Sequence, residues 1–596
     1  MSPPTAAPFP LHDTLIIGAG PSGLAVAARL REETPSAMFT DDEHQRYHWI
    51  NKHRGRMALV QARQSGSGQR WKQRGAEGVR AERYRGVQSR FQPGSLSSGS
   101  DSGSSTGSDI ASSPPGLSSS VTSSSSSFTE EEEEEEQDDG NTSTLVLDSS
   151  APRWMEKWNR AFKTLEIEQL RSPMFFHVDP RDRDGMLAYT QEAARGAELW
   201  EISGPPAEPE IDERDRKDYF APSTRLFADY CQTIVARYRL NTPGLIRQSE
   251  VVDIQYGDHA EGKIFTVTAA DGSKHYSRTV VLAIGPGSQK IFPFPLSPAE
   301  QHGACHSADI RGFPSPNVAA KIRRRQPSHL VVVGGGLSSA QIVDMAVRRG
   351  VTKVWLLMRS EYKVKHFDLA LNWMGKFKNL EKARFWSADS DEERAAIIQL
   401  ARGGGSITPH YTKLLKQHAA RGAVSIHPRT VLTSHTYHPE SQTWSLATDP
   451  PIPALADTPI DYIYFATGMR ADVAEMPLLQ SMRAQYPVDI VQGLPCLTED
   501  LMWRDGVPLF LAGRLAALRL GPGAANLDGA RLGAERIAWG MEEFLGRGPG
   551  HGKGGQVEGE GERERERACF CGLGNRFKEL EFMAEDEEER ECAVLC

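Results

Sequence analysis

Two glycine-rich turns carry the residue pattern that binds dinucleotide cofactors. Each turn follows a short aliphatic run, at residues 14–17 and 329–333, and precedes a run with the apolar spacing of a helix. In such a strand–turn–helix unit, the free backbone N–H groups at the helix start bind a pyrophosphate. Two turns of this kind predict a protein that holds two dinucleotides and passes electrons between them. The turns consist of Gly18, Gly20, Pro21, Ser22 and Gly23, and of Gly334, Gly335, Gly336, Ser338 and Ser339.

The glycines of the first turn have separate roles. Gly18 makes the tight turn, Gly20 lets the backbone approach a pyrophosphate, and Gly23 lets the helix pack on the strand. The predicted second strand is residues 36–40, and Asp41 at its end would accept hydrogen bonds from an adenosine ribose. The acids that follow it, at 42 and 43, are alternatives. A first turn near the N-terminus with a second one mid-chain is the layout of flavoproteins with two dinucleotides, so by this analogy the first site takes FAD.

The second turn is followed by a basic residue where an acid would select NAD. The predicted strand at 353–358 leads into Arg359, whose guanidinium can fork onto the 2′-phosphate of NADP. Ser360, Lys363 and Lys365 add possible donors nearby. An exposed arginine at a strand end is the alternative interpretation. The pattern favours NADPH over NADH.

Two low-complexity stretches interrupt the part of the chain that carries these sites. The Ser/Gly-rich stretch with its glutamate run, and the Gly-rich acidic tail, cannot bury enough apolar surface to order themselves, so we expect both to be disordered. The predicted order is an FAD-binding domain at 11–62, a disordered insertion at 63–148, a second FAD-domain part at 149–322, an NADPH-binding domain at 323–464, a third FAD-domain part at 465–546 and a disordered tail at 547–596.

Charge, hydropathy and cysteine usage exclude several classes of protein. A net charge of −9 offers no positive field for nucleic acid, and no apolar run is long enough to cross a membrane. The N-terminus lacks the basic start and apolar segment of a signal peptide. Seven scattered cysteines form neither a disulfide framework nor, with histidines or acids, a cluster at metal spacing. We therefore expect a cytoplasmic protein without metal, with a small-molecule substrate and O₂ as its partners. The oligomeric state is open.

Several further segments, in order along the chain, resemble the flavin-containing monooxygenase superfamily. The chain is most similar to its N-hydroxylating branch of ornithine and lysine monooxygenases, and to the oxidative-stress-induced growth inhibitor proteins. The resemblance covers about residues 11–60 and 150–545 and rests on the segments 47–61, 170–176, 222–230, 280–286, 306–309 and 465–468.

This resemblance implies an α/β fold with two Rossmann-like domains, the NADP domain being inserted in the FAD domain. It implies FAD and NADPH as cofactors, with Trp49 and Gln61 beside the flavin. Thr467 and Gly468 would lie where the chain re-enters the FAD domain. Asn526 and Asp528 precede the final amphipathic run, whose helix dipole would face the flavin's N1/C2=O edge. An ordinary capped C-terminal helix is the alternative.

One segment departs from the family's pattern. Ornithine and lysine hydroxylases carry an acidic Asp-Asp-Ser-x-Phe-x-Asn stretch after the second nucleotide strand, whereas residues 365–373 read KHFDLALNW. His366, Asp368 and Asn372 are the catalytic candidates there, although no catalytic residue is assigned. The altered spacing speaks against ornithine or lysine as the substrate. His177 and His306 are further histidines near the expected centre, and for all three histidines a structural role is the alternative to proton transfer.

The cysteines separate the flavoprotein mechanisms. Cys231, Cys305 and Cys496 have no neighbouring partner in sequence, which argues against a dithiol reductase. We therefore expect an FAD-dependent, NADPH-using monooxygenase that forms a C4a-hydroperoxyflavin and oxygenates a small N- or S-containing substrate. The alternatives are a weakly catalytic or non-catalytic growth-regulatory flavoprotein, and a Baeyer–Villiger oxygenase or NADPH oxidase.

Overall fold

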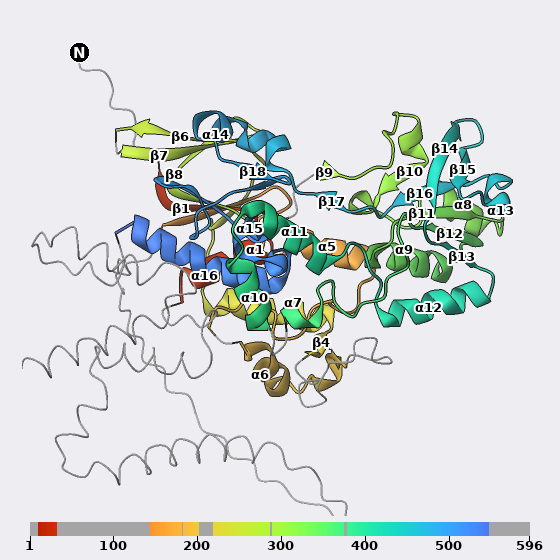
Figure 1. Cartoon of the computed structure of the whole chain (residues 1–596), viewed down its shortest axis with the longest axis horizontal. Helices are drawn as coiled ribbons and strands as arrows, with labels where there is room; N and C mark the ends of the chain where they lie inside the picture. Colours follow the sequence, from red (N-terminus) through yellow and green to blue (C-terminus); the bar gives the residue numbers. More distant parts are fainter. Residues whose placement is uncertain are drawn as a thin grey trace, which may run out of the picture. The chain divides into compact units, whose positions relative to one another are not determined.

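The computed structural model describes residues 10–32, 143–181, 183–201, 219–260, 262–285, 289–374 and 378–546. The calls on Asp41, Trp49 and Gln61, on most of the insertion and on the tail lie outside these ranges. The described residues contain two mainly parallel sheets with helices around them (Figure 1).

The first sheet carries the first glycine turn at the end of its central strand. Strand β1 (Leu11–Ile17) pairs in parallel with β2 (Thr144–Asp148) on one side and with β8 (Lys274–Leu282) on the other. The path β20-β21-β8-β1-β2-β5 includes the Rossmann strand order 3-2-1-4-5. Its remaining strands are β5 (Ile246–Gln248), β6 (Val251–His259), β7 (Gly262–Ala269), β20 (Met502–Arg504) and β21 (Val507–Leu511).

The position of β2 extends the first sheet into the predicted insertion. The two neighbours of β1 are β2 and β8, so residues 144–148 form the strand on one side of β1. The predicted boundary at residue 149 therefore falls after a strand that belongs to the first sheet. The predicted second strand at 36–40 lies outside the described residues.

The second sheet carries the second glycine turn in the same way. Strands β10 (Ala304–His306), β16 (Tyr462–Phe465), β11 (His329–Val333), β12 (Lys353–Leu357) and β13 (Val424–His427) lie in that order, all parallel. Leu330 and Val332 of β11 join the core beneath the helices, whereas Val331 faces the hairpin of β14 (Val431–His438) and β15 (Thr443–Asp449). A parallel sheet is covered on both faces in this way.

The chain passes between the two sheets twice, at one place. Strand β9 (Gln289–Lys290) leaves the first sheet region, β17 (Met469–Arg470) returns to it, and the two pair antiparallel. The NADP-type unit is thus inserted in the FAD-type unit, as predicted.

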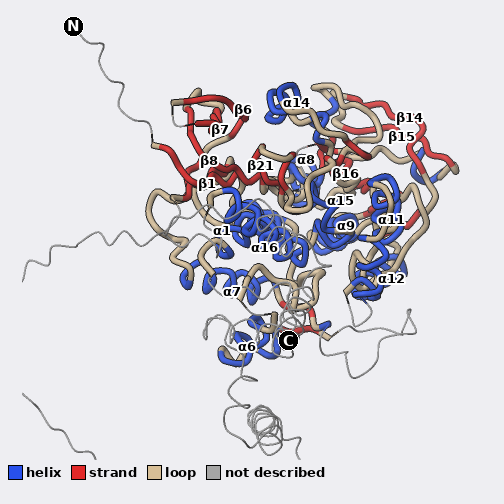
Figure 2. Tube along the Cα trace, turned by 60° about the vertical axis from the view of Figure 1, so that its left-hand side comes forward, coloured by secondary structure: helices blue, strands red, loops and turns tan. Residues whose placement is uncertain are grey.

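Helices cover both sheets (Figure 2). Helices α1 (Pro21–Arg29) and α16 (Leu527–Phe544) pack on each other, and Arg29 Nε donates to Glu535 Oε2 at 2.8 Å between them. The other helices are α5 (Glu156–Thr164), α6 (Gly185–Glu192), α7 (Thr224–Arg237), α8 (Pro316–Arg323), α9 (Leu337–Arg348), α10 (Lys378–Trp386), α11 (Asp391–Arg402), α12 (Pro409–Ala420), α13 (Pro453–Ala456), α14 (Gln480–Gln485) and α15 (Ala517–Leu520).

Part of the predicted NADPH-binding domain packs on the other unit. Phe367, Leu369, Trp373 and Phe385 are buried in the core of the first sheet, not in that of the second. The segment from the end of β12 through α11 therefore connects the two nucleotide-type turns, and it contains all three catalytic candidates.

Candidate functional site

The first glycine turn has the geometry that a pyrophosphate needs. Gly18 has φ +110°, and a Cβ there would lie 2.5 Å from the carbonyl oxygen of Ala283. Gly20 is the N-cap of α1, Pro21 and Ser22 open the helix, and a Cβ on Gly20 would meet nothing within 4 Å. The space over Gly20 and the free N–H groups behind it can therefore admit a phosphate.

An acid that the sequence analysis missed lies beside this turn. Asp148 ends β2, and its Oδ2 accepts a hydrogen bond from the backbone N–H of Ala19 at 2.8 Å. Burial raises the pKa of this carboxyl, but hydrogen bonds from Ala19 and Ser150 outweigh burial and bring the pKa below its ordinary value. Asp148 thus carries a charge at the strand end where Rossmann folds place the ribose acid. The aliphatic run TLVLD at residues 144–148, which ends in an acid, was the sequence pattern that could have identified Asp148.

The second glycine turn has the same backbone arrangement as the first. Gly334 has φ +153°, Gly336 is the N-cap of α9, and Gly335 completes the bend between them. Ser339 is buried and its Oγ donates to the carbonyl oxygen of Gly336 at 2.6 Å, so this serine fits where a glycine or alanine is usual. Ser338 is half-buried in the first turn of α9.

Two exposed residues follow β12 beside this turn. Arg359 and Ser360 are exposed, and a Cβ on Gly335 would lie 3.8 Å from Ser360 Oγ. Lys363 Nζ donates instead to the carbonyl oxygen of Gly403 at 2.8 Å. Arg359 and Ser360 are therefore the donors that the structure brings to the end of β12.

A glycine loop lies against the second turn. A Cβ on Gly405 would stand 3.1 Å from atoms of Gly335 and Gly336. Arg171 fixes the end of this loop, donating to Ser406 O at 2.9 Å and to Ser406 Oγ at 2.8 Å. The loop thus borders the place that a pyrophosphate would take.

The connection between β16 and β17 holds two more predicted residues, Thr467 and Gly468. The Oγ1 of Thr467 donates to the carbonyl oxygen of Ile291, and the carbonyl oxygen of Gly468 accepts from His306 Nε2 at 3.0 Å. Burial lowers the pKa of His306. His177 is buried as well, with Nε2 2.8 Å from the carbonyl oxygen of Arg183. These contacts favour the structural interpretation of both histidines.

The three catalytic candidates are held by other side chains and by backbone. Asp368 Oδ2 accepts from Arg402 Nη2 at 2.8 Å, and Asn372 Nδ2 donates to Glu381 Oε1 at 2.7 Å. The carbonyl oxygen of His366 accepts from Arg171 Nε at 3.2 Å. The contacts of Asp368, of the Asn372 amide nitrogen and of the His366 carbonyl position this segment, whereas Asn372 Oδ1 is buried without a hydrogen-bond partner.

The N-terminus of α16 meets this segment. Asn526, the N-cap residue, donates through Nδ2 to Asp368 Oδ1 at 3.0 Å, so predicted cofactor and catalytic candidates touch. Asp528 lies in the first turn, with Oδ2 3.9 Å from Lys382 Nζ. Arg402 Nη1 also donates to the carbonyl oxygen of Pro522 at 3.0 Å.

A shallow groove lies at this point, about 330 Å³ when the open solvent at its mouth is included, and we term it the α16 groove. It is lined by Phe176, Leu369, Trp373, Lys382, Phe385, Trp386, Leu520, Gly521, Pro522, Gly523 and Asp528.

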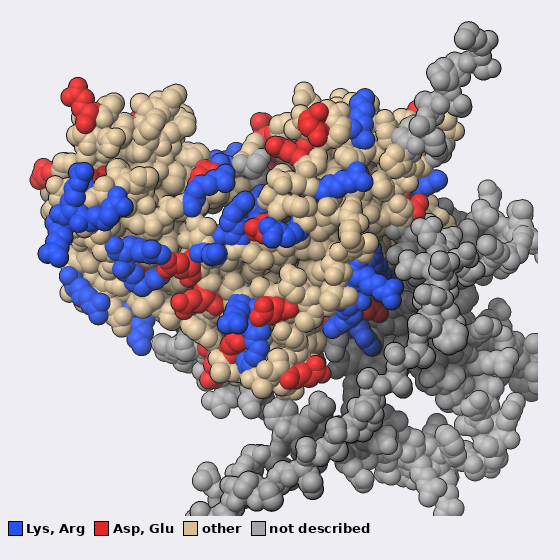
Figure 3. All heavy atoms as spheres, turned by 180° about the vertical axis from the view of Figure 1, so that it is seen from behind, with Lys and Arg blue, Asp and Glu red and all other residues tan. Residues whose placement is uncertain are grey.

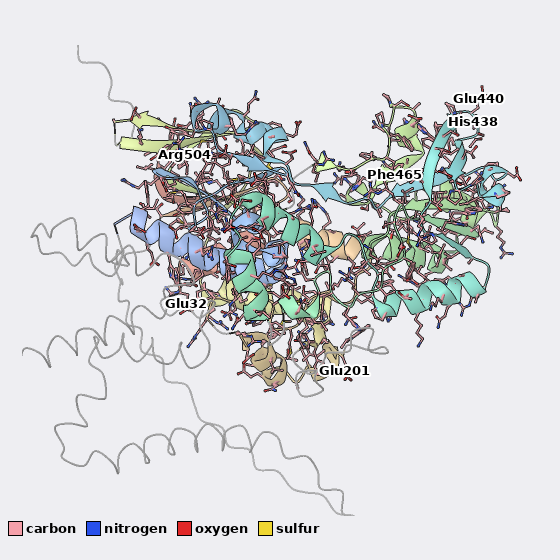
Figure 4. All side chains as sticks on the ribbon, in the orientation of Figure 1. Glu32, Glu201, His438, Glu440, Phe465 and Arg504 are labelled. Carbon is pink, nitrogen blue, oxygen red and sulfur yellow. The ribbon has the colours of Figure 1, made fainter. Side chains whose placement is uncertain are left out.

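A larger groove of about 710 Å³, including its open mouth, lies between α9 and α12. Leu337 and Gln341 line one wall, Tyr411 another, and Glu201 stands at its edge after β3 (Leu199–Trp200) (Figure 4). On the face in Figure 3, lysines and arginines are interspersed with acids. Among the described residues, no helix has the length and hydropathy of a membrane span.

Comparison with known proteins agrees with this geometry. Residues 216–471 match the model of the L-lysine 6-monooxygenase/L-ornithine 5-monooxygenase family. No curated protein matches. Among solved structures, ornithine hydroxylase PvdA from Pseudomonas aeruginosa is 14% identical with a TM-score of 0.52, covering 90% of this chain and 100% of its own. An ornithine N-hydroxylase from Kutzneria sp. 744 is 13% identical with a TM-score of 0.52 and the same coverages, 90% and 100%.

These structures confirm the predicted two-domain α/β fold. The family match confirms the resemblance to the N-hydroxylating branch and, with it, the class of enzyme: a flavin-dependent NADPH monooxygenase. The likeness to growth inhibitor proteins stays a prediction, as do the roles assigned to single site residues.

Proposed function

Since residues 216–471 belong with the lysine and ornithine monooxygenases, we propose that this enzyme uses FAD at the first turn and NADPH at the second to oxygenate a small N- or S-containing substrate. The observation that carries the proposal is the segment 366–373, which lies between the two turns and touches the helix start at Asn526.

The residues around the first turn fit FAD. Gly20 leaves room for the pyrophosphate, and the ionised carboxylate of Asp148 would accept hydrogen bonds from the ribose hydroxyls. Asp148 thus takes the role that the sequence analysis gave to Asp41. Bound there, FAD would accept a hydride from NADPH and activate O₂ at its C4a carbon.

The N-terminus of α16 would hold the other end of the flavin. The helix dipole places positive charge at Asn526 and the following turn, which favours a negatively charged N1/C2=O edge. Asp528 would oppose that charge by itself, and Lys382 at 3.9 Å offsets it.

The second turn fits NADPH. Gly336 opens α9 toward the pyrophosphate, and exposed Arg359 can bind the 2′-phosphate through two of its guanidinium N–H groups. Ser360 adds a hydroxyl donor beside the turn.

A reducing cytoplasmic setting is part of the proposal. It is supported by the free thiols of Cys231, Cys305 and Cys496 among the described residues.

The test is to purify the full chain, measure its bound flavin, and follow NADPH oxidation in air. We expect NADPH to bleach the flavin faster than NADH does, and an added substrate to divert O₂ from H₂O₂ to an oxygenated product detected by mass spectrometry. A chain that binds no FAD after reconstitution, or whose flavin NADPH leaves oxidised, would refute the proposal.

A further inference from the structure

Three helices of the second unit end at one edge of its sheet. Helices α8, α9 and α12 lead into β11, β12 and β13, so their C-termini lie at the edge where these parallel strands begin. Val318 of α8, Val343 of α9 and Leu415 of α12 belong to one core, so the three helices cover the same face of the sheet. The glycine turn lies at the opposite edge, where β11 ends.

The edge where the three helices end is densely basic. Residues 316–353 and 409–421 carry ten lysines and arginines and a single acid, Asp344, in a chain whose net charge is −9. Asp344 is buried, and its carboxylate contacts Arg348 and His418. Six of the ten bases are exposed and form no ion pair with another residue that the structure describes. We term them the basic edge: Arg323, Arg324, Arg325, Lys413, Lys416 and Arg421.

Other bases beside these six have acidic partners. Glu166, which follows α5, pairs with both Arg348 and Arg349, and Asp461 pairs with Lys321 at 2.5 Å. The fold therefore supplies acids to the bases around the basic edge but none to the basic edge itself.

Helix capping explains only part of the basic edge. A cation in the last turn of a helix is stabilised by the free carbonyl groups there, which accounts for Arg323 at the end of α8. Arg325 lies two residues beyond α8, and Lys413 and Lys416 lie in the body of α12. Unpaired cations so close in the fold repel one another and create a positive potential that attracts an anion.

The spacing of the helices favours an extended acidic segment over a single small anion. Packed helices lie about 8–10 Å apart, so three in a row span about 16–20 Å. An extended chain advances about 3.3 Å per residue, so about five or six consecutive acids would cover that distance. A lone phosphate or carboxylate would meet the end of one helix only.

The C-terminal part of this same chain contains such a segment. Residues 585–589 read EDEEE, and residues 579–591 carry eight acids and one base, Arg590. The described part of the chain ends at Gly546, and residues 547–584, 38 positions, separate it from the acidic segment. A connection of that length spans up to about 130 Å, whereas a globular body of about 400 residues has a radius of gyration of about 21 Å. The connection is therefore long enough to reach the basic edge.

We propose that the basic edge is the docking site for the acidic segment 585–589 of the same chain. The carboxylates lie across the ends of α8, α9 and α12. Each exposed ion pair contributes little, so the contact depends on several pairs together and weakens with salt. Covalent attachment gives the segment an effective concentration in about the millimolar range, which populates even a weak contact. Because the basic edge and the glycine turn lie at opposite ends of β11, docking leaves the cofactor turn open.

Zero-length cross-linking of the purified full chain by a carbodiimide tests this contact, since the reagent joins lysine amines to carboxylates in direct contact. Trypsin cleavage after Lys578 and Arg590 releases the acidic segment as peptide 579–590, distinct from the peptide with the glutamate run at 130–136. We expect Lys413 and Lys416 to be joined to peptide 579–590, with a yield that falls in about 0.5 M salt. A mixture of ¹⁵N-labelled and unlabelled chains separates cross-links within one chain from those between two copies.

One triple variant changes the basic edge and a second one is its matched control. Replacing Arg323, Arg324 and Arg325 together by Gln keeps both lysines and should lower the cross-link yield at least about threefold. The control removes three exposed arginines from other elements and should cross-link as the parent does: Arg153→Gln, Arg225→Gln and Arg504→Gln. Equal melting temperatures and equal NADPH binding show that both variants are folded.

Several outcomes would overturn the inference. They are no cross-link from Lys413 or Lys416 to peptide 579–590, equal loss in the two triple variants, or cross-links formed solely between labelled and unlabelled chains. Cross-links to the glutamate run at 130–136 in place of peptide 579–590 would assign the basic edge to that run. Sedimentation of the full chain with phosphatidylserine vesicles, without cross-links to peptide 579–590, would assign the basic edge to a membrane surface.

Discussion

Asp368 Oδ1 accepts a hydrogen bond from Asn526 Nδ2 at 3.0 Å, and this contact joins the loop after β12 to the N-cap residue of α16. The other carboxylate oxygen is taken by Arg402 at 2.8 Å. Through these two contacts Asp368 links the loop to the start of α16 and to Arg402 of α11.

Asp368→Asn should lower kcat/KM several-fold but keep the shape of its pH profile. The amide can still contact Asn526 but loses the ion pair with Arg402, so geometry suffers while no proton-transfer group is removed. The measurement is kcat/KM between about pH 5 and pH 9. Disappearance of the acidic limb in the variant would instead identify Asp368 as a general base.

Gly18→Ala should destabilise the protein, whereas Gly20→Ala should weaken its binding of FAD. At Gly18, φ +110° and the nearby Ala283 carbonyl strain any side chain, so the FAD-free protein should lose about 1–3 kcal/mol of stability. At Gly20 a methyl group meets nothing within 4 Å, so the FAD-free protein should melt like the parent and bind FAD more weakly. Melting temperatures with and without FAD separate the two cases. Equal destabilisation without FAD would contradict the assignment of Gly20.

Arg359→Ala should weaken NADPH much more than NADH. The exposed guanidinium at the end of β12 is placed for a 2′-phosphate, which NADH lacks. Arg429→Ala is the matched control, because it removes a nearby positive charge that pairs with Glu361. Stopped-flow flavin reduction gives the apparent Kd for both cofactors. Parallel losses for NADPH and NADH would remove the basis for the NADPH assignment.

Arg171→Lys should loosen the glycine loop beside the second turn. A lysine cannot reproduce the fork that Arg171 makes to the carbonyl oxygens of Lys365 and Ser406. Leaving such acceptors unsatisfied costs about 1–3 kcal/mol each. We expect a lower Tm and faster proteolysis within residues 400–407. Arg225→Lys, at a site 87% exposed, should change neither, and a similar effect there would argue against a role of the fork.

Asp500→Asn should stabilise the protein at neutral pH. Burial, together with nearby acids, raises the pKa of Asp500 from 3.8 to about 6. The folded chain therefore binds more protons than the unfolded chain between these values, and stability falls as pH rises through this window. The variant should have a Tm about 2 °C or more above the parent at about pH 7.5, with the gap closing toward about pH 4. A constant gap across this range would show that charge is not the cause.

The glycine turns were predictable because backbone conformation and close packing dictate their residues. Gly18 and Gly334 adopt φ values that side chains rarely tolerate, and this constraint is visible in sequence. Strand β2 was assigned to the insertion because a long stretch of chain separates it from α1.

The contacts of the candidate site could not be predicted in the same way. Nothing in the spacing of Asp368 reveals that Arg402 and Asn526 would hold it, since 158 positions separate Asp368 from Asn526. The ring walls of the α16 groove likewise come from segments that only the fold brings together. Residue types at one turn are local information, whereas the lining of a groove depends on tertiary packing.

The pairing of β9 with β17 has a consequence for how this chain can change. Strand β9, which leaves the first unit, pairs with β17, which returns to it, so the second sheet lies within a long loop whose two ends are adjacent. Insertions or losses within that loop, outside the residues from Phe367 to Phe385 that pack in the core of the first sheet, leave the register of that sheet untouched. Beyond those residues, the nicotinamide unit can therefore vary in size and surface while the flavin unit keeps its packing.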